Sequence, residues 1–288
     1  TIANVCGEEI LSQILTKNAV KTVFHAAAYK HVPLLETNVY ASLVNNVLGT
    51  ESVVKASIAS GVSSFTLVST DKAVRPTNVM GASKRFAELV CQVYARTQNT
   101  TKISMVRFGN VLDSSGSVIP LFRRQISSGG PLTVTHRDMT RYFMTIPEAA
   151  QLVIQASNMT TDGEGFLLDM GSPVLILDLA KSMIRLSGYQ PYLAEENNGS
   201  SGPGIDQIEI NFSHLRPGEK LYEELLITNT ALPTRHPRIM KADEQSVEFE
   251  ELTLHLKEMK TSIENGDVQA TLTMLKRLPL NYSPNFVS

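Results

Sequence analysis

The chain has 288 residues, 42% of them hydrophobic and 19% charged, a balance that is ordinary for a globular protein with a large core or two lobes and unlike a disordered chain. Lysine and arginine number 26 and aspartate and glutamate 28, so the net charge of -2 gives no electrostatic reason to expect nucleic acid or an anionic membrane as a partner. Two cysteines, Cys6 and Cys91, with no CxxC pair, argue against a disulfide framework and a structural zinc site.

The sequence contains no run of about 18 apolar residues and no signal peptide. We therefore expect this chain neither to span a membrane nor to be exported, and its cysteine usage fits a reducing cytoplasmic setting. The first residues, TIANVCGEEIL, enter a turn and a helix without an initiator methionine. This start indicates a piece of a longer protein.

The first half of the chain alternates short β-branched runs with amphipathic helices, which predicts a parallel sheet with crossover helices. The expected strands are KTVFHAAA, SSFTLVS and KISMVRFGN, and the first is expected to be buried. The expected helices cover 40–60 and 81–98. Met80 and Lys84 lie one turn apart near the start of the second helix, so they can share a face directed towards the strand ends.

The pattern changes after about residue 115, where short strands mix with helices such as PEAAQLVIQASN. We expect a second, smaller lobe there, interleaved with the sheet. The polar, glycine-rich stretch 195–204 predicts a surface loop. A helix is expected after Pro217 and Gly218, and two more within 247–278.

Three of the predicted strands end in polar turns, HAAAYK, STDK and RFGN. Ligands of open α/β sheets bind outside the carboxyl ends of the strands, so these turns are expected to build one site. Ser69, Thr70, Asp71 and Lys72 form the second turn; taken alone, they are more typical of a capped turn with a solvated lysine than of a site. Lys84, preceded by small residues that let a flat cofactor approach the backbone, favours a functional role.

The motifs HAAAYKHVP, NNVLGT, STDKAVRPTNVMGASK, RFGNVL, GSVIPLF, TRYFMT, LDMG and RPGEKLYEEL occur in that order. Together they resemble the extended short-chain dehydrogenase/reductase family, and more closely its polysaccharide-biosynthesis UDP-N-acetylglucosamine 4,6-dehydratases. The resemblance covers nearly the whole chain from His25 to the final helix. It implies an α/β fold with a Rossmann-like, doubly wound parallel sheet and a smaller mixed α/β lobe that binds the substrate.

One departure from the family is the absence of a GxGxxG motif, which holds the cofactor pyrophosphate and would precede residue 1. The first βαβ part of the sheet is thus expected to be missing from this chain, which would expose one edge of the sheet. The resemblance implies an NAD-binding domain over 1–115, with some later segments returning to it. It implies a UDP-sugar-binding lobe with C-terminal helices over 116–288.

The resemblance also implies which residues hold the cofactor, which we expect to be a tightly bound NAD, with NADP left open. Asn4 and Val5 match the place where such proteins carry Asp-Val against the adenine, and an asparagine amide still offers a donor and an acceptor there. Asn46 is expected to tie adjacent strand ends together behind the nicotinamide. The full set of predicted cofactor-binding residues is Asn4, Val5, Ala26, Ala27, Ala28, Lys30, Asn46 and Lys84.

The second departure is Met80, which stands where ordinary members carry the tyrosine of a Tyr-x-x-x-Lys pair. A thioether has no titratable proton, so the proton of the substrate hydroxyl must be taken by another group. A helical methionine is usually a core residue. The resemblance gives it a different meaning, because a membrane-associated subset of the dehydratases carries methionine here and is thought to retain configuration at the sugar C5.

The reaction that the resemblance implies oxidises the sugar at C4, eliminates water across C5 and C6 and returns hydride to C6, with NAD as the carrier. We expect Asp71 to act as the acid at O6 and Lys72 as the base at C5, entering as a neutral carboxylic acid and a neutral amine. Thr70 is expected to bond or relay the proton of the C4 oxygen. Lys84 is expected to bind the nicotinamide ribose and to raise the positive potential near C4.

The UDP-sugar requires bidentate cations for its diphosphate, and the family-like motifs point to Arg141 and Arg216 rather than to surface arginines. Asn110 is expected at the phosphate or acetamido group, and the backbone around Thr133 at the uracil. Glu219 is equally suited to a ribose hydroxyl or to the first turn of a helix. Lys30 and His31 follow a strand end and are expected to line the sugar or nicotinamide pocket, and no metal is predicted.

Two other functions stay open beside the dehydratase. One is a nucleotide-sugar 4-epimerase or reductase, which would not need the acid and base of STDK. The other is a cofactor-binding scaffold without turnover. A homo-oligomer, a dimer or larger, is expected from the resemblance, and a cytoplasmic location that includes attachment of the parent chain to the inner face of the membrane through an N-terminal segment.

Overall fold

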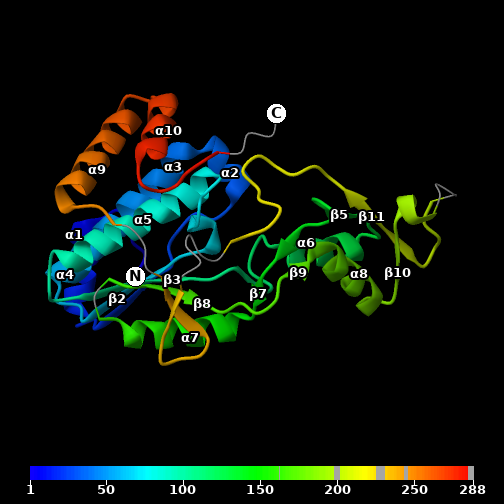
Figure 1. Cartoon of the computed structure of the whole chain (residues 1–288), viewed down its shortest axis with the longest axis horizontal. Helices are drawn as coiled ribbons and strands as arrows, with labels where there is room; N and C mark the ends of the chain where they lie inside the picture. Colours follow the sequence, from blue (N-terminus) through cyan, green and yellow to red (C-terminus); the bar gives the residue numbers. More distant parts are fainter. Residues whose placement is uncertain (162, 198–201, 225–230, 243–245, 285–288) are drawn as a thin grey trace.

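The computed structural model describes residues 1–161, 163–197, 202–224, 231–242 and 246–284. These residues form two lobes that lie side by side (Figure 1). The larger lobe holds a six-stranded sheet with helices on both faces, and the smaller lobe holds a three-stranded sheet. The predicted α/β class with a mostly parallel, Rossmann-like sheet is confirmed.

The large sheet brings together strands from both halves of the chain. Four neighbouring strands are parallel, and the last two are antiparallel additions at one edge. In spatial order the strands are β1 (Thr22–His25), β2 (Ser64–Val68), β3 (Lys102–Arg107), β8 (Gly165–Leu168), β13 (Ile239–Ala242) and β12 (Ala231–Pro233). The division of the chain at residue 115 stays a prediction, and β8, β12 and β13 are strands beyond it that return to the sheet.

Helices cover the two faces of this sheet, as the alternating pattern predicts. One face carries α1 (Glu8–Lys17), α4 (Gly49–Ala59) and α5 (Val79–Arg96). The other face carries α7 (Ile146–Met159), which packs on β2, β3 and β8. The single helix expected over 40–60 consists of α3 (Val39–Leu43), a π-helical turn (Val44–Leu48) and α4 in direct succession.

The expectation that the first strand is buried was wrong. In β1 only His25 is buried, and the side chain of Phe24 is 45% exposed. The physical reason is that β1 pairs with β2 on one side and stands at the edge of the sheet among the described residues. An exposed edge of the sheet agrees with the prediction made from the missing glycine-rich motif.

The smaller lobe has its own core between a sheet and two helices. Its three parallel strands are β10 (Gln190–Tyr192), β11 (Gln207–Phe212) and β5 (Leu132–Val134). The helices are α6 (Val118–Ser127) and α8 (Ile176–Leu186), whose apolar faces meet these strands. Two further strand pairs are short. They are β4 (Asn110–Val111) with β7 (Phe143–Met144), and β6 (Thr140–Arg141) with β9 (Val174–Leu175).

Two expectations in this half differ from the structure. Residues 217–218 form a turn and 219–224 are not helical, so the helix predicted after Pro217 and Gly218 does not begin there, and 225–230 lie outside the described residues. The expected loop at 195–204 begins with a short 3-10 helix, Ala194–Asn197, and residues 198–201 also lie outside the described residues.

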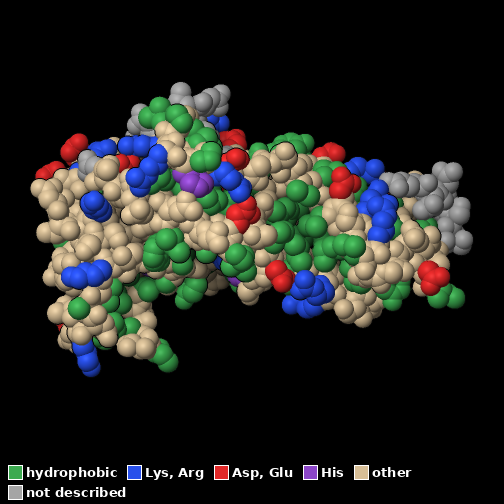
Figure 2. All heavy atoms as spheres, turned by 90° about the horizontal axis from the view of Figure 1, so that it is seen from below, with side chains coloured by type: hydrophobic (Ala, Val, Ile, Leu, Met, Phe, Trp, Pro, Cys, Tyr) green, Lys and Arg blue, Asp and Glu red, His purple; other side chains and the backbone are tan. Residues whose placement is uncertain are grey.

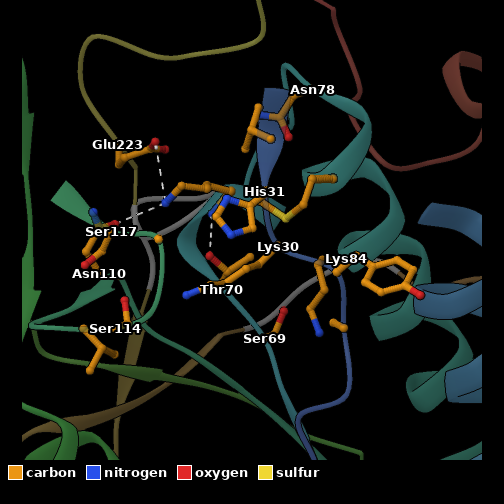
Figure 3. Close-up of a pocket in the computed structure, with 18 of the residues that line it drawn as sticks. Lys30, His31, Ser69, Thr70, Asn78, Lys84, Asn110, Ser114, Ser117 and Glu223 are labelled. Carbon is orange, nitrogen blue, oxygen red and sulfur yellow. Dashed lines mark hydrogen bonds and ion pairs between the residues drawn. The ribbon is translucent and has the colours of Figure 1, made fainter. Parts of the chain in front are cut away.

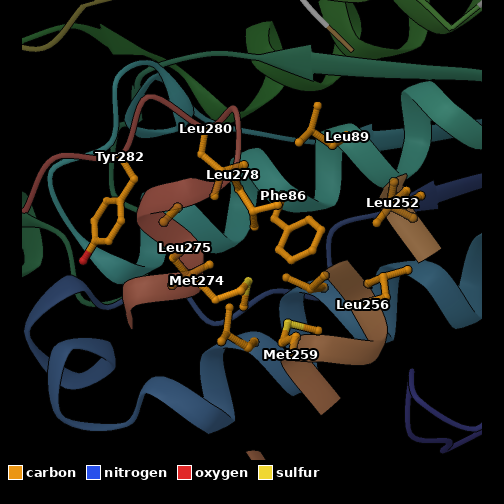
Figure 4. Packing of buried hydrophobic residues seen from close by; sticks show 14 of the residues in the cluster. Phe86, Leu89, Leu252, Leu256, Met259, Met274, Leu275, Leu278, Leu280 and Tyr282 are labelled. Carbon is orange, nitrogen blue, oxygen red and sulfur yellow. The ribbon is translucent and has the colours of Figure 1, made fainter. Parts of the chain in front are cut away.

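The two predicted terminal helices are confirmed as α9 (Phe249–Glu264) and α10 (Val268–Arg277). They form a hairpin that covers α5 and α3 on the face turned away from the sheet (Figure 1). Figure 4 shows Phe86 of α5 enclosed by Leu256 and Met259 of α9 and by Met274 of α10. This apolar contact fixes the helix that carries Met80 and Lys84.

The surface of the molecule agrees with its near-zero net charge. On the face shown in Figure 2, basic side chains lie scattered with acidic ones between them, and no large basic patch is present on that face. No helix within the described residues combines the length and the apolar character needed to cross a membrane.

Candidate active site

A cavity of 460 Å³ lies at the carboxyl ends of β1, β2 and β3, where the polar turns were predicted to meet. Residues from both lobes point into it (Figure 3). Of the predicted site residues, those that line it are Ala26, Ala28, Lys30, His31, Thr70, Lys72, Met80, Lys84, Asn110, Arg141, Arg216 and Glu219. Those outside its lining are Asn4, Val5, Ala27, Asn46, Asp71 and Thr133.

The turn after β2 carries a hydrogen-bonded set of three side chains. The Nζ atom of Lys72 donates to Oδ1 of Asp71 at 2.9 Å and to Oδ1 of Asn110 at 3.3 Å. Thr70 Oγ1 donates to the same Asp71 oxygen at 2.8 Å. Asp71 is fully buried behind Lys72, and its Oδ2 atom has no hydrogen-bond partner among the described residues. Asp71 therefore reaches the cavity through Lys72 and Thr70.

Two glycines allow this turn to pack so closely. A Cβ atom on Gly81 would lie 2.2 Å from the carbonyl oxygen of Lys72, so the first turn of α5 needs glycine there. A Cβ atom on Gly109 would lie 3.1 Å from Oδ2 of Asp71. The backbone of α5 and the end of β3 thus hold the acidic and basic side chains from two sides.

Lys72 faces two carboxylates across the cavity. Glu223 Oε1 lies 3.8 Å from the Lys72 Nζ atom, in addition to the closer Asp71. Burial disfavours the ammonium, but the charges of Asp71 and Glu223 outweigh it and raise the pKa of Lys72 above its ordinary value. The raised pKa favours the ammonium form of Lys72, and its entry into a reaction as a neutral amine stays a prediction.

Met80 and Lys84 lie one turn apart on α5, and both line the cavity. Lys84 Nζ donates to the carbonyl oxygen of Val68 at 2.7 Å, which fixes the amine at the end of β2. Burial lowers the pKa of Lys84 to about 8, against the attraction of Glu88. Met80 is 3% exposed and brings a thioether, which has no titratable proton, to the lining of the cavity.

A buried ionic network lies behind the site. Ser69 Oγ donates to Glu88 Oε1 at 2.6 Å, and Arg107 Nε donates to the same oxygen at 2.7 Å. Arg85 Nη1 binds the other carboxylate oxygen at 3.1 Å. Burial opposes the charge of Glu88, but the two arginines and Ser69 lower its pKa to about 2. The network ties α5 to the ends of β2 and β3, where the Ser69–Lys72 turn begins.

Asn46 lies in the π-helical turn and joins the end of β1 to α5. Its Oδ1 atom accepts the backbone N–H of Tyr29 at 2.8 Å, and its Nδ2 atom donates to the Tyr29 carbonyl oxygen at 3.1 Å and to Ser83 Oγ at 2.9 Å. Asn46 thus ties the loop after β1 to α5, while the expected tie between adjacent strand ends and a direct contact with a cofactor stay predictions.

The two histidines near the site have different surroundings. Burial and the nearby Lys84 lower the pKa of His25 to about 3, and its Nε2 atom pairs with Thr50 Oγ1 at 3.0 Å, so His25 is neutral. His31 lines the cavity and rests against Gly116, where a Cβ atom would come within 2.2 Å of its ring. No group of three metal-binding side chains occurs in the part of the chain that the structure describes.

The predicted substrate-binding residues differ in whether their hydrogen-bond donors are already bound within the protein. Arg216 is exposed and lines the cavity, and its backbone N–H binds Glu219 Oε2 at 3.2 Å. Arg141 also lines it, but its guanidinium donates to the carbonyl oxygens of Thr140, Lys220 and Leu221. The backbone N–H of Thr133, expected at the uracil, donates instead to Oε1 of Gln125 at 3.2 Å.

The residues present fit the nicotinamide half of a dinucleotide. Ala26 and Ala28 leave room at the end of β1, and Lys84 is fixed beside them in the same cavity. Asn4 lies outside the cavity lining, and its side-chain oxygen accepts the backbone N–H of Cys6 at 2.9 Å. The adenine contact of Asn4 and Val5 therefore stays a prediction.

Sequence reasoning missed four polar residues that line the cavity, namely Asn78, Ser114, Ser117 and Glu223. Glu223 is the most consequential because it faces Lys72. Its signal was available in the motif RPGEKLYEEL, where two adjacent glutamates, Glu223 and Glu224, precede the final leucine. The expected helix hid that signal, since Glu223 then belonged to a regular surface element.

The sequence of the chain is similar to proteins of polysaccharide biosynthesis and to nucleotide-sugar epimerases. Residues 1–244 match the family model described as polysaccharide biosynthesis protein. The capsular polysaccharide biosynthesis protein CapD of Staphylococcus aureus is 52% identical over 232 residues, which are 81% of this chain and 36% of that protein. The chain thus spans about a third of the length of this relative. A UDP-glucose 4-epimerase of Rickettsia canadensis is 37% identical over 73% of this chain and 57% of the relative.

Solved structures give the same picture. The structure of Pen from Bacillus thuringiensis has a TM-score of 0.72 and 31% identity, and the match covers 89% of this chain and 80% of Pen. The dTDP-glucose 4,6-dehydratase DesIV from Streptomyces venezuelae, solved with NAD and TYD bound, has a TM-score of 0.59 and 18% identity, over 74% of this chain and 69% of DesIV. At 18% identity, the similarity to DesIV shows a shared fold alone.

Proposed function

Because this chain belongs to the polysaccharide biosynthesis branch of the extended short-chain dehydrogenase/reductase family, we propose that its cavity binds UDP-N-acetylglucosamine and that its residues catalyse 4,6-dehydration of the sugar. The product is UDP-2-acetamido-2,6-dideoxy-4-hexulose, a precursor for glycan synthesis. The observation that carries the proposal is the Asp71–Lys72 pair, hydrogen-bonded at 2.9 Å at the end of β2.

The charge of the cavity supports an anionic substrate. Lys30, Lys84 and Arg216 line it together with Lys72, and the acidic side chains among its lining residues are Glu219 and Glu223. Arg216 is the cation best suited to the diphosphate, because its guanidinium is exposed at the cavity. Arg141 acts indirectly, since its donors hold the segment that carries Glu219 and Glu223.

Elimination of water needs a base at C5 and an acid at O6. A proton shift along the Lys72–Asp71 hydrogen bond converts the ion pair into a neutral amine and a carboxylic acid. Lys72 then takes the C5 proton while an acid proton from Asp71 leaves with O6 as water. The step ends with the ionised pair, and the ammonium of Lys72 returns a proton to C5 when C6 is reduced.

Bound NAD supplies a reversible hydride acceptor at C4, so the cycle has no net redox change. Lys84 holds the ribose of that cofactor, and its positive charge favours loss of hydride nearby. Thr70 Oγ1, already bonded to Asp71, passes the proton of the C4 hydroxyl to solvent, and Lys72 takes one proton back from solvent after it has reprotonated C5. Met80 takes no proton, which suits an enzyme in which C5 keeps its configuration.

A second candidate is a nucleotide-sugar 4-epimerase, favoured by the sequence likeness to the Rickettsia enzyme. An epimerase exchanges hydride at C4 alone, so it has no use for an acid and a base that reach C6 and C5. Loss of one water from the product separates the two reactions. A scaffold without turnover predicts no product from either route.

The test uses full-length protein incubated with UDP-N-acetylglucosamine in deuterated water, with the product examined by mass spectrometry and NMR. A 4-keto-6-deoxy sugar that carries deuterium at C5 is expected, with C5 unchanged in configuration. Lys72→Ala should lower turnover by about 10²–10⁴-fold, the usual weight of a general base. Lys257→Ala, an exposed lysine on α9, is the control and should turn over normally. A product that retains all its oxygen would exclude the dehydratase.

A further inference from the structure

Glu223 is a buried carboxylate to which neither the sequence nor the proposed reaction gives a role. Its side chain is 3% exposed, and Oε1 lies 3.8 Å from both Lys72 Nζ and Arg141 Nη2. Its Oε2 atom is buried without a hydrogen-bond partner among the described residues. Burial of a carboxylate that is only partly bonded is costly, so the two cations must offset that cost.

Glu223 reaches the cavity on a segment that several long-range contacts hold in place. We call residues 215–224 the strap. Arg141 donates to the carbonyl oxygens of Lys220 and Leu221 at 2.8 and 3.2 Å. Lys220 Nζ donates to the Val74 carbonyl oxygen at 2.9 Å, on the loop that follows Lys72. The strap is therefore anchored within a few residues of Glu223 on both sides of the cavity.

Lys72 has acceptors in three directions because of the strap. Asp71 stands at 2.9 Å, Asn110 at 3.3 Å and Glu223 at 3.8 Å from Nζ. The ammonium donates to Asp71 and Asn110, and the charge of Glu223 attracts it from a third side, so the three groups together fix the direction of the amine. Asn110 and Glu223, which Figure 3 labels on different elements at the cavity, both lie near this nitrogen.

We propose that Glu223 is a positioning residue for the Lys72 amine: the strap holds its carboxylate opposite Asp71, where it orients the ammonium and favours the protonated state. This inference rests on the proposed function only in giving Lys72 the role of base. The balance of charge at Nζ follows from the groups that face it, namely Asp71 and Glu223 as anions, Arg141 as a cation and Asn110 as a neutral acceptor.

The direction of the effect follows from these charges. The carboxylate of Glu223 helps to raise the pKa of Lys72, while Arg141 opposes it. Glu223→Gln keeps the shape of the side chain and removes its charge, so the pKa of Lys72 should fall. More of the lysine is then a neutral, nucleophilic amine at any given pH, without greater access to reagents.

The experiment is competitive acetylation of the folded full-length protein at about pH 9, below the ordinary pKa of lysine. The Lys72 peptide is quantified by mass spectrometry against the peptide that carries the exposed Lys257. Glu223→Gln should raise the relative rate at Lys72 by about tenfold, as expected for loss of one nearby opposite charge. Glu223→Asp, which keeps the charge on a shorter side chain, should fall between the two and serves if the glutamine variant does not fold.

Glu224→Gln is the matched control, because Glu224 is the next residue and pairs with Arg75 at the surface, 3.2 Å away. It should leave the rate at Lys72 unchanged. If Glu223→Gln and Glu223→Asp react at Lys72 as the wild type does, the proposal is overturned. A tenfold rise confined to Glu223→Gln, with Glu223→Asp intermediate, supports it.

Acetylation needs no substrate, so this result stands whether or not the protein dehydrates UDP-N-acetylglucosamine. A second readout links it to turnover where activity is found. The limb of the pH–rate profile that reports Lys72 should move to lower pH in Glu223→Gln and stay in place in Glu224→Gln. If Glu223→Gln acetylates faster at Lys72 as expected but neither wild type nor any variant forms product, only the proposed function is contradicted.

Discussion

At the scale of single residues, the site depends on charges that are buried in matched sets. Lys72 lies among two carboxylates and an amide, and Glu88 lies among two arginines and a serine. The first set faces the cavity and carries the proposed chemistry. The second lies behind the cavity and holds the start of the Ser69–Lys72 turn, because its Ser69 directly precedes Thr70.

Glu88→Gln should destabilise the fold by about 3–5 kcal/mol, because two buried arginines lose the carboxylate they share. The pKa of Glu88 is about 2 in the folded chain against an ordinary 4.5. Its charge therefore stabilises the fold above pH 4.5, and this contribution disappears as the pH falls towards 2.

Urea unfolding at several pH values measures both effects. Wild type should lose stability through this acid range, while Glu88→Gln should show a flatter dependence. Glu258→Gln removes an exposed partner of Arg277 and should cost about 1 kcal/mol or less. Equal acid sensitivity in wild type and Glu88→Gln would contradict the assignment of the network.

At the scale of elements, α5 connects the core to the chemistry. Its first two turns carry Met80 and Lys84 at the cavity, while its outer face packs against the α9–α10 hairpin. The hairpin is far from the site in the sequence but fixes the helix on which two site residues stand (Figure 4). The packing thus contributes to function through the orientation of α5.

Leu256→Ala should destabilise the chain by about 2–5 kcal/mol, since Leu256 is 5% exposed within the cluster around Phe86 and leaves a cavity when shortened. Leu254→Ala on the same helix is the matched control, because that side chain is 63% exposed and its loss should cost less than about 0.5 kcal/mol. Denaturant unfolding followed by circular dichroism compares the two. Similar losses in both variants would show that the hairpin does not pack on α5 in this way.

At the scale of the whole molecule, the strap joins the two lobes across the cavity. Thr77 Oγ1 and Asn78 Nδ2 in the larger lobe both donate to the carbonyl oxygen of Gly218, each at 2.9 Å. Arg141 holds the next residues from the other side. Any relative motion of the lobes therefore has to break these bonds or carry Glu219 and Glu223 along.

Gly218→Ala should release the strap, because Gly218 has a φ of 78° and a Cβ atom there would lie 2.7 Å from Cβ of Asn78. We expect faster hydrogen exchange in 215–224, measured by mass spectrometry. Gly171→Ala is the control for backbone strain alone. Its φ is 70°, as unfavourable for alanine as that of Gly218, but no atom lies within 4 Å of the added methyl group. It should destabilise by about 1 kcal/mol without loosening the strap. Unchanged exchange in Gly218→Ala would contradict this role for the glycine.

The sequence determined the features that depend on local order. The alternation of strands and helices, the polar turns at strand ends and the pair of terminal helices all follow from side-chain periodicity over a few residues, and all are present. The Asp71–Lys72 pair and the shared face of Met80 and Lys84 could be predicted for the same reason. The first two are neighbours in the sequence, and the other two are one helical turn apart.

Only the tertiary structure decided what depends on distant partners. β1 is exposed because burial of a strand requires neighbours on both sides, and its own residues do not reveal their number. Gly218 has a positive φ and its carbonyl oxygen binds Thr77 and Asn78, so its segment forms a strap where a helix was expected. The same contacts bring Glu223 to Lys72 across about half the chain. No local sequence pattern predicts this contact. The conformation of the segment is set by hydrogen bonds to residues far away in the sequence, and side-chain periodicity carries no information about such partners.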